Sequence, residues 1–391
     1  MRRDDVQPAL PPELLNNDPE GFAWGVWHDR TPKLVTQVRD ANPYGPEQRR
    51  ALDALLEEIA SGVMQPLGPR AHDQQVWASW GADYFGKPWL DAPFLWSESY
   101  FYRRLLDAVG FFEPGPWHWF DAFEYLKTAE LRDAALEPDL AALDDLQRLD
   151  VEDQGRAKLL GSLWGNRADL GFRFGSTAGP DGPAAARVVV DQSAALWAAL
   201  TPGASVVLVA DNAGRELLAD LALIDHLLTH CHVGSVTLHV KPHPYYVSDA
   251  TAADVVACLR RLAHTPGSAA KAAHRVQSAM SEGRAGLYTH DFYCAPWSFH
   301  RMPADLAAQF EQATMTVLKG DLNYRRLVGD RDWPPTTPFT HVASYFPGAV
   351  AALRTLKSDV ITGLDSATVA ELDATGQPWR TDGSHGLVQV G

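Results

Sequence analysis

The chain has 391 residues, of which 46% are hydrophobic and 21% charged, and its formal net charge is −15. Because this length exceeds what one hydrophobic core usually spans, we expect a large domain with a smaller companion. The acidic balance argues against a nucleic-acid-binding protein, which needs a basic surface to neutralise phosphates. A small anionic ligand held by a few local cations remains compatible with this charge.

The three cysteines, Cys231, Cys258 and Cys294, have neither CxxC nor zinc-knuckle spacing, so we expect no disulfide and no structural zinc. Arg2 and Arg3 are not followed by an apolar segment, and no apolar run reaches the length of about 18 residues that a membrane helix needs. We therefore expect a cytoplasmic protein that does not bind a membrane. The polar first 20 or so and last 15 or so residues are expected to fray.

The first part of the chain has helical periodicity. In residues 45–64, leucine and isoleucine recur at every third or fourth position, which is typical of a helix with one buried face. The aromatic-rich residues 95–112 repeat this period, and the acidic residues 137–166 indicate one or two further helices. We predict a mainly helical N-terminal domain over residues 1–160.

Beyond about residue 185, short β-branched segments alternate with helical ones, although residues 186–200 are ambiguous. The expected strands are residues 204–211, 235–241, 284–291, 313–321 and 352–364. Such alternation predicts a mostly parallel sheet with helices on both faces. Residues 161–391 are therefore expected to form a Rossmann-like α/β/α sandwich, without the GxGxxG loop that binds dinucleotides.

Polar side chains follow several of these strands. They are Asp211, Asn212, Asp249, Asp321, Asn323, Lys357 and Asp359. Because the carboxyl ends of parallel strands share one edge of a sheet, these residues can converge. Two carboxylates and an amide oxygen suit Mg²⁺ or Mn²⁺, and Arg325, Arg354 and Lys357 are candidates to bind an anion beside the metal. This combination indicates phosphoryl transfer.

Each of these features also has a purely structural explanation. Asp211 can cap the helix that begins near Arg215, and Asp249 can cap the helix over residues 251–263. Residues 320–327 can form a glycine turn that opens a helix with solvated arginines. The joint occurrence of the three features favours a functional site over these explanations.

The histidines offer a second candidate metal site, because His226 and His230 lie four residues apart, with His232 close by. The glutamate of HExxH is missing and the helix is apolar, so we expect these histidines to complement the helix dipole rather than to bind zinc. His239 is expected in the core, and His243, between two prolines, at a pocket rim. Acyl transfer is not expected, since Gly-x-Ser-x-Gly is absent.

Six motifs occur in an order that resembles the damage-control phosphatases, in particular the branch with an Arg-Thr-x-Lys signature that includes acidic-residue methyltransferase-like proteins. The motifs are PWLDAPFLWSESYFYRRLL, LWGNRADL, ADNAGRELLADLALIDHLL, PYYVSDATAADV, LKGDLNYRRLVGD and ALRTLKSDV. The matching residues upstream are Glu98, Tyr102, Arg103, Trp164, Gly165, Asn166 and Asp169. The resemblance covers about residues 85–362.

This resemblance implies a helical domain on an α/β/α sandwich and a divalent-metal-dependent phosphatase for small phosphorylated metabolites. The metal ligands of the family fall on Asp211, Asn212 and Asp249. Its substrate contacts fall on Asp321, Leu322, Asn323, Tyr324, Arg325 and Lys357, to which we add Arg354 and the metal-side pair Asp211 and Asn212. Sugar phosphates such as fructose 1-phosphate are the implied substrates, with Mn²⁺, Co²⁺, Ni²⁺ or Mg²⁺ as the metal.

The predicted mechanism is hydrolysis of a phosphomonoester, with Asp211, Asn212, Asp249 and Asp321 as catalytic residues. The metal polarises the phosphate or activates water, and Lys357 and Arg325 neutralise the phosphate charge. Asp321 either contacts the sugar or acts as general base. We prefer Asp211 as a ligand to Asp211 as a nucleophile, because DxDx(T/V) is absent.

Two departures from the family pattern leave the substrate open. Arg215 replaces an aromatic residue after the Asp-Asn-Ala-Gly run and is expected to line the pocket, and the residues after Asn166 lack the usual serine. Two other functions therefore stay open. One is a methyltransferase that uses S-adenosylmethionine on protein carboxylates, and the other is a repurposed metal- or anion-binding protein of a specialised pathway. The oligomeric state is not predicted.

Overall fold

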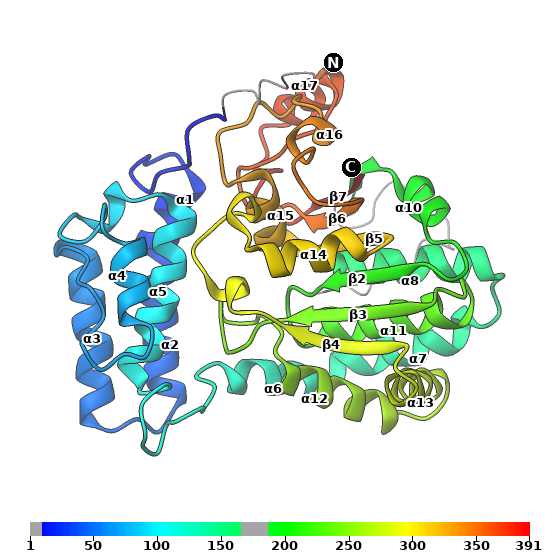
Figure 1. The fold of residues 1–391 in the computed structure, drawn as a ribbon, viewed down its shortest axis with the longest axis horizontal. Coiled ribbons are helices and arrows are strands. Elements are labelled where there is room, and N and C mark those ends of the chain that lie inside the picture. Colours follow the sequence, from blue (N-terminus) through cyan, green and yellow to red (C-terminus); the bar gives the residue numbers. More distant parts are fainter. Residues whose placement is uncertain (1–9, 166–186) are drawn as a thin grey trace.

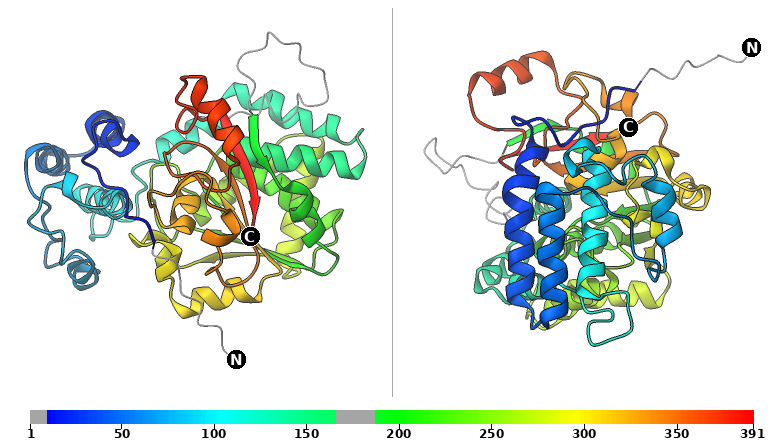
Figure 2. Two further views of the ribbon diagram at one scale, coloured as in Figure 1. Left: turned by 90° about the horizontal axis from the view of Figure 1, so that it is seen from above. Right: turned by 90° about the vertical axis from the view of Figure 1, so that its left-hand side faces the viewer.

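The computed structural model describes residues 10–165 and 187–391. A helical part, blue and cyan in Figure 1, stands beside an α/β/α sandwich, and the two further views in Figure 2 show the same division. This arrangement confirms the predicted fold class. None of the helices in the described ranges is long and apolar enough to cross a membrane.

The sandwich is built on a seven-stranded sheet in the order β1-β7-β6-β5-β2-β3-β4. Its strands are β1 Arg187–Asp191, β2 Ser205–Val209, β3 Ser235–Val240, β4 Ala285–Thr289, β5 Met315–Lys319, β6 Val350–Thr355 and β7 His385–Val390. Strands β6, β5, β2, β3 and β4 run parallel, whereas β7 is antiparallel to β6 and parallel to β1. The five strands expected from the sequence are present, but the last one ends at Thr355 and residues 356–364 form no strand. The ambiguous segment contains β1 and the helix α10 (Ser193–Ala199).

The expectation that both ends of the chain fray is wrong for the residues that the structure describes. Residues 385–390 form β7, whose Leu387 and Val388 are buried between the neighbouring strands. Near the other end, the Leu14 amide donates to the Asp330 carbonyl at 3.0 Å, and the Phe94 amide donates to the Leu14 carbonyl at 2.8 Å. Backbone pairing and apolar burial hold both segments despite their polar composition.

Helices cover both faces of the sheet. They are α6 Glu124–Arg132, α7 Glu137–Leu146, α8 Val151–Trp164, α10 Ser193–Ala199, α11 Arg215–Thr229, α12 Ala252–Ala263, α13 Ser268–Ser281, α14 Ala304–Gln312, α15 Gly320–Val328, α16 Phe339–Val342 and α17 Ser366–Ala374. Helices α7, α8, α11, α12 and α13 share one apolar core with the sheet, and α14 to α17 share the other. The strands are buried on both faces for this reason, which explains their uninterrupted apolar sequences.

The helical part packs around aromatic side chains. It contains α1 Phe22–Gly25, η1 Val26–Arg30, α2 Thr31–Ala41, α3 Pro46–Ser61, α4 Gln74–Trp80 and α5 Phe94–Val109. Helix α3 follows the predicted stripe, with Leu52 and Leu55 buried. Three residues of the sandwich, Tyr245, Cys294 and Leu322, belong to the same core, so the helical part is fixed against the carboxyl ends of the parallel strands.

The strand order creates a crevice at one place on that edge. From β2, the chain continues to β3 and β4 on one side, while β5 and β6 lie on the other. At such a reversal the two connections leave in opposite directions, and ligands of open α/β sheets bind in the resulting gap. The turns after β2 and β5 are therefore where the fold favours a site.

Candidate active site

The turn after β2 is joined to the segment after β3. The Ala250 amide donates to the Asp211 carbonyl at 2.8 Å, and the Ala213 amide donates to the Ser248 carbonyl at 2.7 Å. Asn212 and Asp249 form an isolated β-bridge. The structure thus brings together Asp211, Asn212 and Asp249, the three residues expected to hold a metal.

Helix capping does not explain the two aspartates. Gly214 occupies the N-cap of α11, which has no side-chain cap. Helix α12 is capped by Thr251, whose hydroxyl and amide are both bonded to the Asp254 carboxylate. Asp211 and Asp249 are therefore buried carboxylates without a capping role.

Their electrostatic environment is unfavourable for two negative charges. Burial, together with the carboxylates of Glu216 and Asp249, raises the pKa of Asp211 well above its ordinary value. Burial raises the pKa of Asp249 to about 6, although the Lys241 ammonium lies 3.3 Å from its Oδ2 and opposes this shift. Carboxylates in this position need a further positive charge to stay ionised.

Glu216 is a residue of the site that the sequence did not reveal. Its Oε2 accepts a hydrogen bond from Asn212 Nδ2 at 2.9 Å, and its Oε1 accepts from Lys319 Nζ at 2.9 Å. Burial opposes ionisation of Glu216, but the ammonium groups of Lys319 and Lys357 hold its pKa below the ordinary value. Glu216 is therefore a fixed negative charge that orients the Asn212 amide.

A pocket of about 360 Å³ opens at this edge, at the reversal of strand order. Its lining comes from the helical part, α8, the turns after β2, β5 and β6, and the loop before β7. The lining residues are Phe22, Arg30, Leu163, Trp164, Asp211, Glu216, Gly320, Asp321, Thr355, Lys357, Thr381, Asp382 and Gly383. The pocket has the carboxylates of Asp211, Glu216 and Asp321 in its lining and a volume suited to a small metabolite.

Gly320 allows the two central turns to approach each other. Its φ is +80°, and a Cβ atom at this position would lie 1.8 Å from Asp211 Oδ2. Any other residue would collide with the carboxylate and adopt a disfavoured backbone conformation. The glycine before Asp321 therefore has a steric function in the site.

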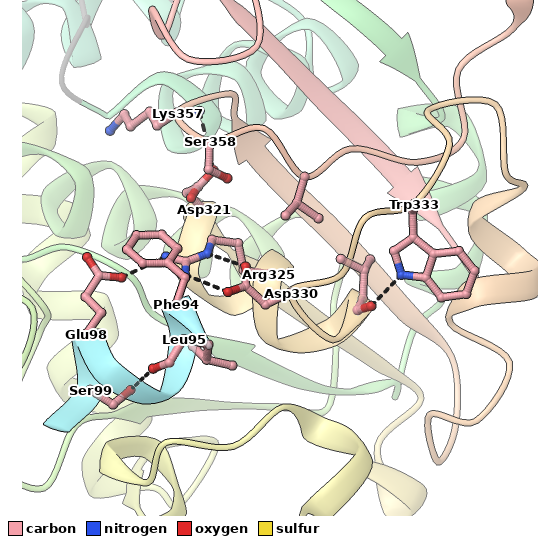
Figure 3. A network of polar contacts seen from close by, with 12 residues as sticks. Phe94, Leu95, Glu98, Ser99, Asp321, Arg325, Asp330, Trp333, Lys357 and Ser358 are labelled. Carbon is pink, nitrogen blue, oxygen red and sulfur yellow. Dashed lines mark hydrogen bonds and ion pairs between the residues drawn. The ribbon is translucent and has the colours of Figure 1, made fainter. Parts of the chain in front are cut away.

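The three cations predicted to bind an anion lie in different surroundings. Arg325 is buried, and its guanidinium bonds to Glu98 at 2.9 Å and to the Asp330 carboxylate at 2.7 and 2.9 Å (Figure 3). Arg354 is also buried and pairs with Asp321 at 2.8 Å. Of the three predicted cations, Lys357 alone lines the pocket, and its side chain extends away from this network (Figure 3).

The run after β5 forms the support of the pocket. Leu322 belongs to the aromatic core of the helical part. Asn323 Nδ2 donates to the Ala210 and Lys319 carbonyls at 3.0 and 2.8 Å, which joins the ends of β2 and β5. Tyr324 is buried with its hydroxyl bonded to Thr362 at 2.9 Å. Asp321 lines the pocket, and direct substrate contact by the other members of the run stays a prediction.

Comparison with known proteins agrees with these motifs. A sequence model described as the damage-control phosphatase ARMT1-like domain matches residues 26–372. The chain belongs to this family. The damage-control phosphatase ARMT1 of Rattus norvegicus is 30% identical, with 97% of this chain and 98% of that protein covered. The Homo sapiens protein of the same name is 26% identical, with the same coverage.

A solved structure of a DUF89 family protein from Pyrococcus horikoshii also aligns with the chain. It is 13% identical, has a TM-score of 0.47, and covers 90% of this chain and 94% of its own.

The metal ligands expected for this family fit a divalent cation in their chemistry. Asp249 Oδ2 is buried and, among the described residues, has the Lys241 ammonium at 3.3 Å as its charged partner. Asp211 Oδ2 accepts a hydrogen bond from Asn212 Nδ2 at 2.9 Å, and the nearby lysines only partly offset the burial that raises its pKa. Among residues 10–165 and 187–391, no three His, Cys, Asp or Glu side chains are arranged to hold a metal ion. The expected set differs from such a group, because it combines two carboxylates with the amide oxygen of Asn212.

Arg215, where the chain departs from the family pattern, does not line this pocket. Its guanidinium pairs with Asp133 and Asp139, each at 3.3 Å. Arg215 follows Gly214 directly and its side chain points to the acidic helices α6 and α7, while its neighbour Glu216 points into the site. The expectation that Arg215 lines the pocket is therefore wrong.

The remaining sequence candidates lie elsewhere. His239 is fully buried in β3 and hydrogen-bonded with the Tyr293 hydroxyl at 2.6 Å, which confirms a core histidine. His226 is buried in α11. Asn166 and Asp169 lie outside the described residues.

Proposed function

We propose that the protein is a divalent-metal-dependent phosphatase for small phosphorylated metabolites, with sugar phosphates such as fructose 1-phosphate as the substrate class. The observation that carries this proposal is the pocket itself, which joins the buried carboxylates of Asp211 and Glu216 to the ammonium of Lys357. Membership of the damage-control phosphatase family supports the same reaction class.

The metal would be held by Asp211, Asn212 and Asp249. When bound, a divalent ion polarises a phosphate oxygen and lowers the pKa of its water. The chain contributes the orientation of these ligands, because Glu216 fixes the Asn212 amide and Gly320 admits the Asp211 carboxylate. The raised pKa of Asp211 supports a requirement for a cation, since positive charge is what keeps this buried carboxylate ionised.

Lys357 and Asp321 would act on the substrate from the β6 side of the pocket. The Lys357 ammonium has no ion-pair partner among the described residues and is free to bind phosphate oxygens through charge-assisted hydrogen bonds. Burial acts to raise the pKa of Asp321, but the Arg354 guanidinium holds this pKa below its ordinary value. A carboxylate of such low basicity is better suited to accept a hydrogen bond from a sugar hydroxyl than to serve as general base.

Phosphate release by the purified chain tests this proposal. Fructose 1-phosphate and other sugar phosphates are incubated with Mn²⁺, Co²⁺, Ni²⁺ or Mg²⁺, and with a chelator. We expect metal-stimulated hydrolysis that falls at least about 100-fold in Asp211→Asn, because loss of a ligand exceeds the typical cost of losing its supporting contacts.

The matched control is Asp191→Asn. Asp191 also ends a strand of the sheet, but β1 runs opposite to β2, so this carboxylate lies at the other edge. The Asp191→Asn variant should therefore have the turnover of the wild type. Wild-type turnover in Asp211→Asn, or no hydrolysis with any metal, would contradict the proposal. Binding of S-adenosylmethionine in calorimetry without phosphatase activity would instead favour the methyltransferase.

A further inference from the structure

The pocket presents a problem of charge. A phosphomonoester is a dianion near neutral pH, and it must enter beside the carboxylates of Asp211 and Glu216. Arg325 and Arg354, which were expected to neutralise it, are committed to buried carboxylates. Breaking such a pair leaves an uncompensated buried charge, so neither arginine is available without a large cost.

The pocket lining contains two cationic side chains, Lys357 and Arg30. Arg30 is the last residue of η1 in the helical part, and it is exposed. In the described part of the chain, its guanidinium has no ion-pair partner and no hydrogen-bond acceptor. Its donors are therefore available to a ligand, in contrast to those of Arg325 and Arg354.

Arg30 lies between two hollows that share it as a lining residue. It also lines an adjoining hollow of about 330 Å³, together with Phe22, Asp359 and Thr381. The Phe22 amide donates to Asp359 Oδ2 at 2.8 Å. This bond ties the first turn of the helical part to the segment that carries Lys357, and both cations line the same pocket.

We propose that Arg30 is a substrate-binding residue that, with Lys357, binds the phosphate group of the substrate. The inference rests on the proposed function and assigns to the helical part a direct role in recognition. A guanidinium presents a planar pair of N–H donors that matches two phosphate oxygens. The carboxylates of Asp211 and Asp249 would offset the two charges of a bound divalent metal, so Lys357 alone leaves the dianion half neutralised. Arg30 supplies the second positive charge.

Steady-state kinetics of Arg30→Gln test the inference. We expect KM for sugar phosphates to rise about 10-fold or more, because the loss is that of a charge-assisted hydrogen bond. Arg30→Lys should recover part of the loss, since an ammonium keeps the charge without the fork. Lys33→Gln is the matched control, because Lys33 is exposed on the following turn and lies outside the pocket lining.

A second readout does not depend on turnover. Inorganic phosphate should raise the melting temperature of the wild type and of Lys33→Gln, and this protection should be lost in Arg30→Gln. Circular dichroism verifies that the variant is folded. Absence of hydrolysis in the wild type would defeat the proposed function. The rise in melting temperature with phosphate would still test the role of Arg30. Unchanged KM and unchanged protection in Arg30→Gln would overturn the inference.

Discussion

The ammonium of Lys319 lies between two buried carboxylates. It pairs with Glu216 and Asp220, each at 2.9 Å, and bonds to the Ser162 carbonyl. Lys319 and Asp220 are fully buried, so the pairs have low exposure to water. The two carboxylates offset the cost of burying Lys319 and raise its pKa. The lysine thereby fixes Glu216, which in turn holds the Asn212 amide.

Lys319→Met should destabilise the fold strongly, because it leaves two buried carboxylates without their cation. We expect the free energy of unfolding, measured by urea denaturation, to fall by about 3–5 kcal/mol. Adding Asp220→Asn to the Lys319→Met chain should restore part of the lost free energy of unfolding. The exposed Lys271→Met is the control and should change stability by less than about 0.5 kcal/mol. If Lys319→Met lowers the free energy of unfolding no more than the control does, the ion pairs of Lys319 with Glu216 and Asp220 are not needed for stability.

At the residue scale, the sequence predicted that polar residues after the strands come together, but it missed Glu216 and Arg30. Asp211, Asn212 and Asp249 follow strands, and strand ends are recognisable from apolar runs. Glu216 lies within a helix, and Arg30 lies in another part of the fold. No spacing in the sequence relates these two residues to the strand ends, because their place in the site depends on how whole elements pack.

At the scale of elements, β7 is the strand that the sequence did not reveal. It has six residues, as many as β3 and β6, but it follows a polar loop and includes Gly386 and Gln389 among its apolar residues. Its neighbours β1 and β6 supply the pairing that composition cannot indicate. The strands β2 to β6 were predictable, because each is a mostly apolar run and several of them are followed by a segment with helical periodicity.

Leu387→Ala tests the importance of this strand. The side chain is fully buried in the core on the side of α14 to α17, so the cavity should lower the free energy of unfolding by about 2–5 kcal/mol in urea denaturation. Val390→Ala, at the half-buried end of the same strand, should cost less. Equal and small losses would mean that β7 contributes little to the core.

At the scale of the whole molecule, buried histidines make the folded state less stable as the pH falls. Burial lowers the pKa of His226 and His239 to about 3 and that of His243 to about 4. Their reference value is 6.5, so below this pH the unfolded chain binds protons that the folded chain does not. Stability is therefore lost as pH falls from about 6.5 toward 4. Asp249, with a raised pKa, acts in the opposite sense.

The histidines and Asp249 contribute to the pH dependence of stability with opposite signs. The contribution of one histidine is therefore measured by comparing a variant with the wild type. His239→Asn keeps a polar group near the Tyr293 hydroxyl but does not titrate. Between pH 6.5 and 4 its free energy of unfolding should fall less steeply than that of the wild type, by up to about 1.4 kcal/mol per pH unit. The exposed His118→Asn should follow the wild type. Identical slopes for His239→Asn and wild type would refute this assignment.

The predicted division at residue 160 stays a prediction. Helix α8 packs on α11 within the core of the sandwich, and the aromatic core of the helical part includes Tyr245, Cys294 and Leu322. Sequence periodicity describes one element at a time, so it cannot report a core that two parts share.

The position of β7 has a consequence for synthesis of the chain. Thr381, Asp382 and Gly383 line the pocket and directly precede β7, which lies between β1 and β6. While a chain emerges from the ribosome, early segments fold first, yet β1 cannot join the sheet before residues 385–390 have appeared. The pocket therefore lacks part of its wall until the last strand has been made, and a nascent chain should complete the pocket only late in its synthesis.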